Sequence, residues 1–325
     1  MEAKINGVIS LIVMPRKTPE RLTFYEVMMR RSLKRDDYSE LYKIAKAGYD
    51  GELRLDREWK DIRAPGMLFH DFTFYNSATH SHQIDTIYVC KHFVLVIETK
   101  NLAGKIDFNP NTRQLIQSFN NGQSRAYNDP VDQVERHRNF LERHFMLLPE
   151  LIPVETAIIF TNSKCYIGQT SDDISIFVVT GLRAKLNELT KRHQHVNLNT
   201  RLIKSTLEKL YKPISFQKSL DIDSLKYGVL CLYCNEKMIP TNNNFKCLVC
   251  NCYDTEHAAI RRTLYDYRVL FSSEITNEQF RNFAEISSRD TAYGILSRLL
   301  PTKIGSKRHT KYVIPENIYT SQSYK

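Results

Sequence analysis

The sequence predicts a mixed α/β fold, with a central sheet of mixed strand direction flanked by helices. Between residues 50 and 180 a helical pattern is followed by short β-branched and aromatic runs, a second helix and two further apolar runs. Hydrophobic residues make up 42% of the chain and charged residues 25%, a composition that can fill real cores. With 325 residues the chain is longer than one ordinary compact domain, so two or three domains are expected.

The elements follow from local patterns. Residues up to about 20 are expected to form an extended arm, 21–49 a helix, and 50–61 a second helix that Pro65 and Gly66 end. Pro130 opens another helix at a first-turn position. Residues 183–215 are expected to return to helix. The expected strands are 70–76, 84–90, 93–100, 104–108, 113–119, 156–162 and 174–180.

Charge and cysteine content limit the class of protein. The net charge of +10 and pI of about 9.1 suit a polyanionic partner, such as nucleic acid or an anionic membrane surface. Seven cysteines, four of them in C-x-x-C pairs, argue against a disulfide framework. The apolar run VISLIVM is too short to span a bilayer and lacks the features of a signal peptide. A cytoplasmic protein without a membrane segment is expected.

The stretch QIDTIYVCKHFVLVIETK places charged residues at the outer ends of two apolar runs. A hairpin closed by Lys91–His92 would set Asp85 opposite Glu98, on a shared face with Lys100. Opposed carboxylates call for a cation, and Mg²⁺ or Mn²⁺ suits carboxylate oxygens. A neighbouring lysine could polarise a phosphate or orient water. The alternative is that these charges mark only the points where strands re-enter water.

Five short motifs carry a family resemblance. They are Gly51–Glu52, Gln83–Ile84–Asp85, Ile97–Glu98–Thr99–Lys100–Asn101 with Gly104, Asp129–Pro130–Val131–Asp132–Gln133, and His137. Their order and spacing resemble the NERD (nuclease-related) branch of the PD-(D/E)XK nuclease superfamily over roughly residues 45–180. Two positions depart from the motif: Asp129 replaces Asn, and Thr86 stands where the branch often has His.

The resemblance implies a restriction-endonuclease-like fold and metal-dependent cleavage of phosphodiester bonds. Asp85 and Glu98 would hold Mg²⁺ or Mn²⁺, and Glu52 would reach the metal through water or place a ligand. Lys100 would orient the attacking water or stabilise developing charge. Gln133 would position the nucleophile or a phosphate. For Glu52 the alternative is a solvated helix carboxylate, and for Gln133 a hydrogen bond at the helix start.

The stretch CLYCNEKMIPTNNNFKCLVCNC contains two C-x-x-C pairs with room for a hairpin between them. Four thiolates complete a tetrahedral zinc site with no open position, so the sequence predicts a structural zinc ribbon. Cys252 and His257 are surplus and could replace one ligand. The predicted ligands are Cys231, Cys234, Cys247 and Cys250.

The C-terminal region reads as helix, short turn, helix and a hairpin around a basic turn, which resembles a winged helix-turn-helix. Thr276 with Gln279 forms a capping-box pattern, and Ser287 or Ser288 caps the next helix. In this interpretation residues 288–300 are the recognition helix and 303–314 the wing. The alternative is a small helical domain that packs on the nuclease core or on a partner. The residues expected to face DNA, mostly its phosphates, are Arg289, Thr291, Lys303, Lys307, Arg308 and Lys311.

We therefore expect an N-terminal helical extension (1–48), a NERD domain (49–220), a zinc ribbon (228–255) and a winged-helix-like domain (256–325). The expected activity is Mg²⁺-dependent cleavage of DNA by an endonuclease, in defence, plasmid handling or repair. The alternatives are a catalytically silent DNA-binding or scaffolding protein, and an RNA-processing nuclease. Oligomeric state, sequence preference and protein partners are not legible in the sequence.

Overall fold

The computed structural model describes residues 10–75, 81–109, 111–170, 174–242 and 244–319. Its contacts divide the chain into two compact units, each built from two segments. We call the first the sheet unit; it comprises the chain up to Thr18 and Lys46–Ser215. The second, which we call the cysteine unit, comprises Pro19–Ala45 and the chain from Phe216 onward. The division into four parts that the sequence predicts is not tested by this division into two units and stays a prediction.

The first two helices are α1 (Glu20–Arg31) and α2 (Arg35–Asp61). The expected boundary near residue 50 is therefore wrong, because α2 runs through it without a break. The chain leaves the helix instead at Ser32, whose backbone is extended (φ −81°, ψ 136°) and whose hydroxyl accepts a hydrogen bond from the Lys34 amide. The glycines of α2 do not end it, since a lone helical glycine costs only about 1 kcal/mol.

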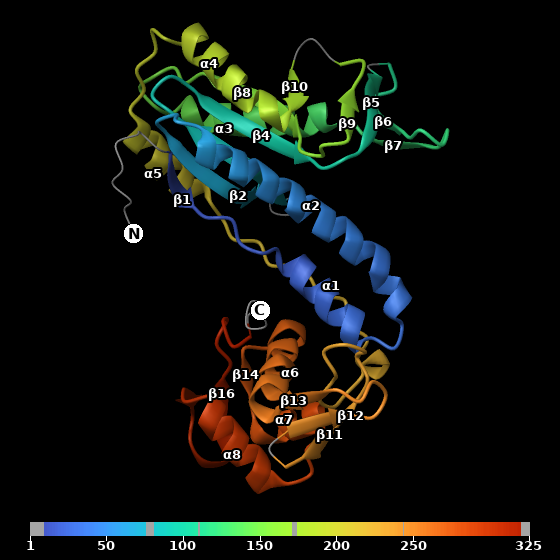
Figure 1. Cartoon of the computed structure of the whole chain (residues 1–325). Helices are drawn as coiled ribbons and strands as arrows, with labels where there is room; N and C mark the ends of the chain where they lie inside the picture. Colours follow the sequence, from blue (N-terminus) through green and yellow to red (C-terminus); the bar gives the residue numbers. More distant parts are fainter. Residues whose placement is uncertain (1–9, 76–80, 110, 171–173, 243, 320–325) are drawn as a thin grey trace. The chain divides into compact units, whose positions relative to one another are not determined.

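The main sheet of the sheet unit has the strand order β1-β2-β3-β4-β8-β10. Figure 1 labels all of these strands except β3. The β1/β2, β4/β8 and β8/β10 pairs are parallel and the other two are antiparallel, so the sheet is mixed as expected. Part of the expected N-terminal arm is the edge strand β1. The strands are β1 (Leu11–Met14), β2 (Met67–Tyr75), β3 (Ser81–Val89), β4 (Val94–Lys100), β8 (Val154–Phe160) and β10 (Ser175–Val178).

Helices cover both faces of this sheet. One face packs against α3 (Pro130–Phe145) and α5 (Thr200–Leu210). The opposite face packs against α2 and α4 (Leu182–Arg192). The expected helix over 183–215 is thus two helices. Successive residues of β4 alternate between the two cores, which is the ordinary period of a strand.

A second, smaller sheet extends the sheet unit, with strand order β7-β6-β5-β9. Gly104 begins it with a positive φ of 85°, and a β-carbon there would lie 2.4 Å from the Ser118 carbonyl oxygen. Only glycine fits this close approach. The strands are β5 (Gly104–Asn109), β6 (Gln114–Ser118), β7 (Ser124–Asn128) and β9 (Cys165–Ile167).

The cysteine unit contains a three-stranded antiparallel sheet, β11 (Met238–Thr241), β12 (Asn244–Cys247) and β13 (Tyr253–Thr255), in that order. Next come α6 (Glu256–Leu270), β14 (Glu274–Ile275), α7 (Asn277–Ala284) and α8 (Arg289–Leu299). The hairpin β15 (Lys303–Ile304) and β16 (Lys311–Val313) completes a second small sheet, ordered β14-β16-β15. The predicted capping box of Thr276 and Gln279 is present, and Ser288 caps α8.

One hydrophobic core joins α1, the cysteine-bearing strands and the C-terminal helices. At its centre the fully buried Asp266 accepts hydrogen bonds from Arg30 Nε at 2.8 Å and Arg31 Nε at 2.7 Å. Arg31 is itself buried, donates to the Gly228 carbonyl and stacks on Phe283. Because a buried charge is tolerated only when it is paired and hydrogen-bonded, this network fixes α1 to its unit.

Across the described ranges, no helix combines the length and the apolar character needed to cross a membrane.

Candidate active site and metal centre

The β3–β4 hairpin has the register that the sequence predicts. Thr86 pairs with Ile97 and Val89 with Val94, and the Cys90 amide donates to the Phe93 carbonyl at 3.1 Å. Extending this register by one position sets Asp85 opposite Glu98. There the ladder changes character, because an Asp85 carboxylate oxygen accepts the Thr99 amide at 2.7 Å. Where β3 and β4 separate, the Asp85 carboxylate therefore accepts a hydrogen bond from the backbone of β4.

Glu98 lies at the centre of a cluster of polar side chains. Its two carboxylate oxygens accept hydrogen bonds from Lys100 Nζ at 2.5 Å and from Gln133 Nε2 at 2.8 Å. The side chain is almost completely buried. Burial is the largest cause that raises the pKa of Glu98 to about 8, followed by the nearby Asp85 charge, while Lys100 opposes the shift. The site therefore disfavours a second negative charge beside Asp85 unless a cation accompanies it.

Gln133 reaches Glu98 because of how α3 begins. Asp129 is the N-cap of this helix, and its side chain accepts the Val131 amide at 2.9 Å, with Pro130 in the first turn. Asp caps a helix as well as Asn does, so the departure from the motif at this position keeps the helix start in place. His137 follows one turn after Gln133, buried beside Phe74 and His82, and burial lowers its pKa to about 4. His137 is thus neutral at ordinary pH.

Glu52 approaches from α2, on the opposite face of the sheet. Gly51 lets the helix come this close: a β-carbon there would lie 2.7 Å from Asn101 Cβ and 2.8 Å from Thr161 Oγ1. Asn101 then holds the helix, donating to the Ala47 carbonyl at 2.7 Å. The glycine before Glu52 and the asparagine after Lys100 therefore dock α2 against the end of β4.

Two residues that the sequence analysis did not select complete this region. Arg16, just after β1, donates to Glu52 at 2.9 Å and to Asp71 at 2.8 Å. Its other nitrogens reach Asp56 at 2.8 Å and the Asp85 carbonyl at 3.1 Å. The Arg16 side chain is 3% exposed. Arg16 lies in the segment expected to be only an extended arm, and nothing in its local pattern indicates this role.

Asp71 is the second residue missed. It lies across the β2–β3 ladder from Asp85, between the pairs His70–Thr86 and Phe72–Ile84, and its φ of 52° is unusual for a non-glycine residue in a strand. Burial raises the pKa of its carboxyl group, and the Asp85 charge adds to this, whereas Arg16 opposes it. A signal did exist in the sequence: Phe69 and Phe72 are three residues apart, which departs from the period of two of a regular strand. The structure places both in the same core.

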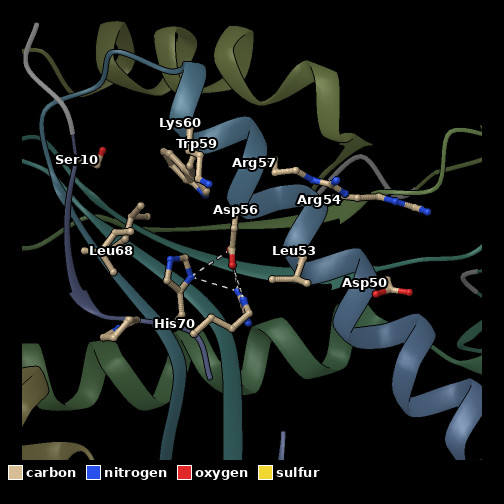
Figure 2. A pocket seen from close by; sticks show the side chains of 13 residues that line it. Ser10, Asp50, Leu53, Arg54, Asp56, Arg57, Trp59, Lys60, Leu68 and His70 are labelled. Atoms are coloured by element: carbon tan, nitrogen blue, oxygen red, sulfur yellow. Dashed lines mark hydrogen bonds and ion pairs between the residues drawn. The ribbon is translucent and has the colours of Figure 1, made fainter. Parts of the chain in front are cut away.

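Arg16 also forms one wall of a cavity of about 560 Å³ between α2 and β1. Figure 2 shows Asp56 and His70 pointing toward each other there. The distance between Asp56 Oδ1 and His70 Nδ1 is 3.6 Å. Arg16 Nη2 lies 3.2 Å from His70 Nδ1. Burial is the largest cause that lowers the pKa of His70 to about 4, so His70 is neutral at ordinary pH and adds no positive charge beside Arg16.

The sulfur atoms of the four predicted cysteine ligands converge. All four lie within 4.8 Å of one another, the only such group of His, Cys, Asp or Glu ligand atoms in the described part of the chain. Three of the Sγ–Sγ distances are 3.4, 3.6 and 3.7 Å, near the roughly 3.8 Å that four ligands around one Zn²⁺ require. This cluster could hold a metal ion. Cys252 Sγ lies 3.2 Å from Cys231 Sγ and 3.3 Å from Cys250 Sγ, so a fifth thiol adjoins it.

Five of the six residues expected to face DNA are exposed. Arg289, Thr291 and Lys307 are exposed. Lys303 and Lys311 are also exposed, but Lys303 lies over the Tyr312 ring and Lys311 pairs with Glu274 at 2.9 Å. The side chain of Arg308 lies outside the described residues.

The donor set at Asp85 and Glu98 fits a hard divalent ion. Lys100 pairs with Glu98, and the Asp85 charge acts on Glu98. The nearby carboxylates of Glu52, Asp56 and Asp71 contact Arg16 instead. Asp85 and Glu98 repel each other through a buried environment, and a divalent cation would relieve this repulsion.

The fold and this site define a mixed α/β domain with paired carboxylates, an amine and an amide at the end of a hairpin. A family model described as "NERD: Nuclease-related domain" matches residues 47–161. This segment, which carries Glu52, Asp85, Glu98, Lys100 and Gln133, is therefore similar to nuclease-related domains. No curated protein and no solved structure gives a significant match to the chain.

Proposed function

We propose that this protein is a Mg²⁺- or Mn²⁺-dependent endonuclease that hydrolyses phosphodiester bonds of DNA. The observation that carries the proposal is the placement of Glu98, buried between Lys100, Gln133 and the charge of Asp85, within the segment that is similar to nuclease-related domains. The PD-(D/E)XK arrangement is part of the proposal and is supported by the β3–β4 register and by the approach of α2 and α3 to it.

In this proposal Asp85 and Glu98 hold the divalent ion, which when bound supplies positive charge to a phosphate. Lys100 Nζ lies 2.5 Å from Glu98 and would orient the attacking water and stabilise negative charge as it develops on the phosphate. Gln133 donates one amide hydrogen to Glu98 and can direct its second toward the water or a phosphate oxygen. Glu52 lies on the other face of the sheet, where Arg16 donates to it at 2.9 Å. From there Glu52 would reach the metal through water or place a metal ligand.

The cysteine cluster is proposed to be a structural zinc ribbon. Its four thiolates would complete the coordination of one ion and leave no position for substrate. Cys231 and Cys247 belong to the same hydrophobic core as α1 and the C-terminal helices, so bound zinc would stabilise the whole cysteine unit.

The C-terminal region is proposed to be a winged-helix-like DNA-binding domain. The order helix, strand, helix, helix, hairpin from α6 to β16 supports this, as does the exposure of Arg289, Thr291 and Lys307. Contacts through such side chains go mainly to phosphates, so retention of DNA should weaken steeply as the salt concentration rises.

The test is a cleavage assay on zinc-loaded protein with supercoiled, linear and single-stranded DNA. Reactions contain Mg²⁺, Mn²⁺, no added divalent ion, or EDTA. Cleavage is expected with Mg²⁺ or Mn²⁺ and should be lost in Glu98→Ala, while the control Glu188→Ala on α4 should cleave like the wild type. Equal cleavage by both variants would place the activity elsewhere. Salt-sensitive DNA retention without cleavage would favour the DNA-binding protein, and cleavage confined to an RNA panel would favour the RNA-processing nuclease.

A further inference from the structure

Arg16 is surrounded by oxygen atoms from three elements. From α2 come Glu52 Oε2 at 2.9 Å and the two carboxylate oxygens of Asp56 at 2.8 and 3.3 Å. From β2 comes Asp71 Oδ1 at 2.8 Å. From β3 come the Asp85 carbonyl at 3.1 Å and Thr86 Oγ1 at 3.0 Å. Carboxylates, a carbonyl and a hydroxyl are also the ligands that hard divalent cations take in proteins.

A guanidinium group has five N–H donors, and these contacts employ all three of its nitrogens. Burial alone would lower the pKa of Arg16, but the hydrogen bond to Asp56 and the charges of Glu52, Asp56 and Asp71 outweigh it and raise the pKa. Arginine also stays charged at every pH that a protein experiences. Arg16 is therefore a permanent cation in this position.

The carboxylates near the end of the β3–β4 hairpin form two groups, according to the cation that each group contacts. Glu52, Asp56 and Asp71 face Arg16, which compensates their charge from within the chain. The carboxylates of Asp85 and Glu98 lie on the other side, and there Lys100 pairs with Glu98. Asp85 links the two groups, because its carbonyl accepts from Arg16 while its carboxylate accepts the Thr99 amide.

We propose that Arg16 takes the place of a second divalent cation, so that the site binds one divalent ion, at Asp85 and Glu98. The single divalent ion at Asp85 and Glu98 rests on the proposed function. The role of Arg16 does not. Because Arg16 lies in the segment before α1, residues 47–161 alone lack the cation that pairs with Glu52, Asp56 and Asp71. Arg16 thus acts as a positioning residue that holds Glu52 and Asp71 beside Asp85.

The test counts bound Mn²⁺ by electron paramagnetic resonance on zinc-loaded protein, in which thiolates retain the softer ion. The variants are Arg16→Ala, Arg16→Lys and the control Arg57→Ala, which removes an exposed arginine from α2. The wild type, Arg16→Lys and Arg57→Ala should each bind one Mn²⁺. Arg16→Ala should bind one more, because three carboxylates then lack their cation. Glu98→Gln should weaken the single wild-type site at least tenfold.

The outcomes are separable from those of the proposed function. Two Mn²⁺ ions in the wild type would overturn the proposal, as would equal counts in the wild type and Arg16→Ala. No ion in the wild type but one in Arg16→Ala would support the role of Arg16 and count against the metal site at Asp85 and Glu98. Emission of Trp59, the single tryptophan, checks that each variant is folded. If Arg16→Ala does not fold, Arg16→Ala/Asp56→Asn is counted instead. It keeps the net charge of these side chains but leaves Glu52 and Asp71 without their cation, so it should also bind one more Mn²⁺ than the wild type, and an equal count would overturn the proposal.

Discussion

Replacing Glu98 by glutamine should stabilise the sheet unit at pH 8 in the absence of added divalent ions. The folded protein raises the pKa of Glu98 to about 8 from the ordinary value of 4.5. Between these two values the unfolded chain loses its proton while the folded chain keeps it, so rising pH favours unfolding. The stability associated with the protonated carboxyl is fully present below about pH 4.5 and is lost as pH rises through about 8.

The size of the effect follows from the shift. A difference of 3.5 pKa units at 1.36 kcal/mol each sets an upper limit of about 5 kcal/mol. Because the pKa of Glu98 also depends on the charges of Asp85 and Lys100, we expect about half of this limit as the stability difference. Glutamine keeps the shape but binds no proton in this range, and it loses about 1 kcal/mol from its weaker contact with Lys100. The net gain of Glu98→Gln at pH 8 should be about 1 to 2 kcal/mol, falling to zero or below near pH 5.

The assay is urea unfolding between pH 5 and 8.5, followed by the emission of Trp59. This single tryptophan is buried in the sheet unit and stacks on Tyr88, so its emission reports the unit that holds the site. With a slope of about 2 kcal/mol per molar urea, the midpoint at pH 8 should rise by about 0.5 to 1 M. Added Mg²⁺ should stabilise the wild type and leave the variant unchanged.

A matched control is Glu188→Gln on α4. Its hydrogen bond with Lys185 is the largest cause that lowers the pKa of Glu188, so this substitution should not raise stability at pH 8. Parallel pH profiles for the wild type and Glu98→Gln would refute the reasoning, because they would show that Glu98 ionises in the folded protein without a penalty.

Three further predictions concern residues that stabilise the sheet unit or the cysteine unit. Gly51→Ala should lower the stability of the sheet unit by about 1 to 3 kcal/mol and reduce cleavage, because its β-carbon would meet Asn101 and Thr161; Gly48→Ala, which has open space, is the control in both measurements. Asp266→Ala should destabilise the cysteine unit by about 3 to 5 kcal/mol in calorimetry, since it leaves buried Arg31 without its partner; a loss below 1 kcal/mol would contradict this. Cys234→Ser should lose its zinc by elemental analysis while Cys252→Ser keeps one ion per chain, and zinc loss in Cys252→Ser instead would exchange the ligand roles.

The sequence predicted the parts of the fold and site that depend on local pattern. Alternating apolar residues and the Lys91–His92 turn give the β3–β4 register, and the C-x-x-C spacing gives the cluster of four sulfurs. Arg16 could not be found in this way, because its partners lie 36 to 70 residues away along the chain. Only the pairing of β1 with β2 brings it to Glu52 and Asp71. The break between α1 and α2 was also missed, since it depends on the extended backbone at Ser32 rather than on a proline or glycine.

The most direct test of the proposed nuclease is the rate of a single round of DNA cleavage by Lys100→Met, with enzyme in excess over DNA. The matched control is Lys105→Met, which removes a lysine that pairs with Asp107 on the second sheet. Lys100→Met should bind DNA like the wild type yet cleave at least about a hundredfold more slowly, because a group that stabilises developing charge is typically worth that much. Lys105→Met should keep the wild-type rate. Equal rates in Lys100→Met and the wild type would contradict the proposed site.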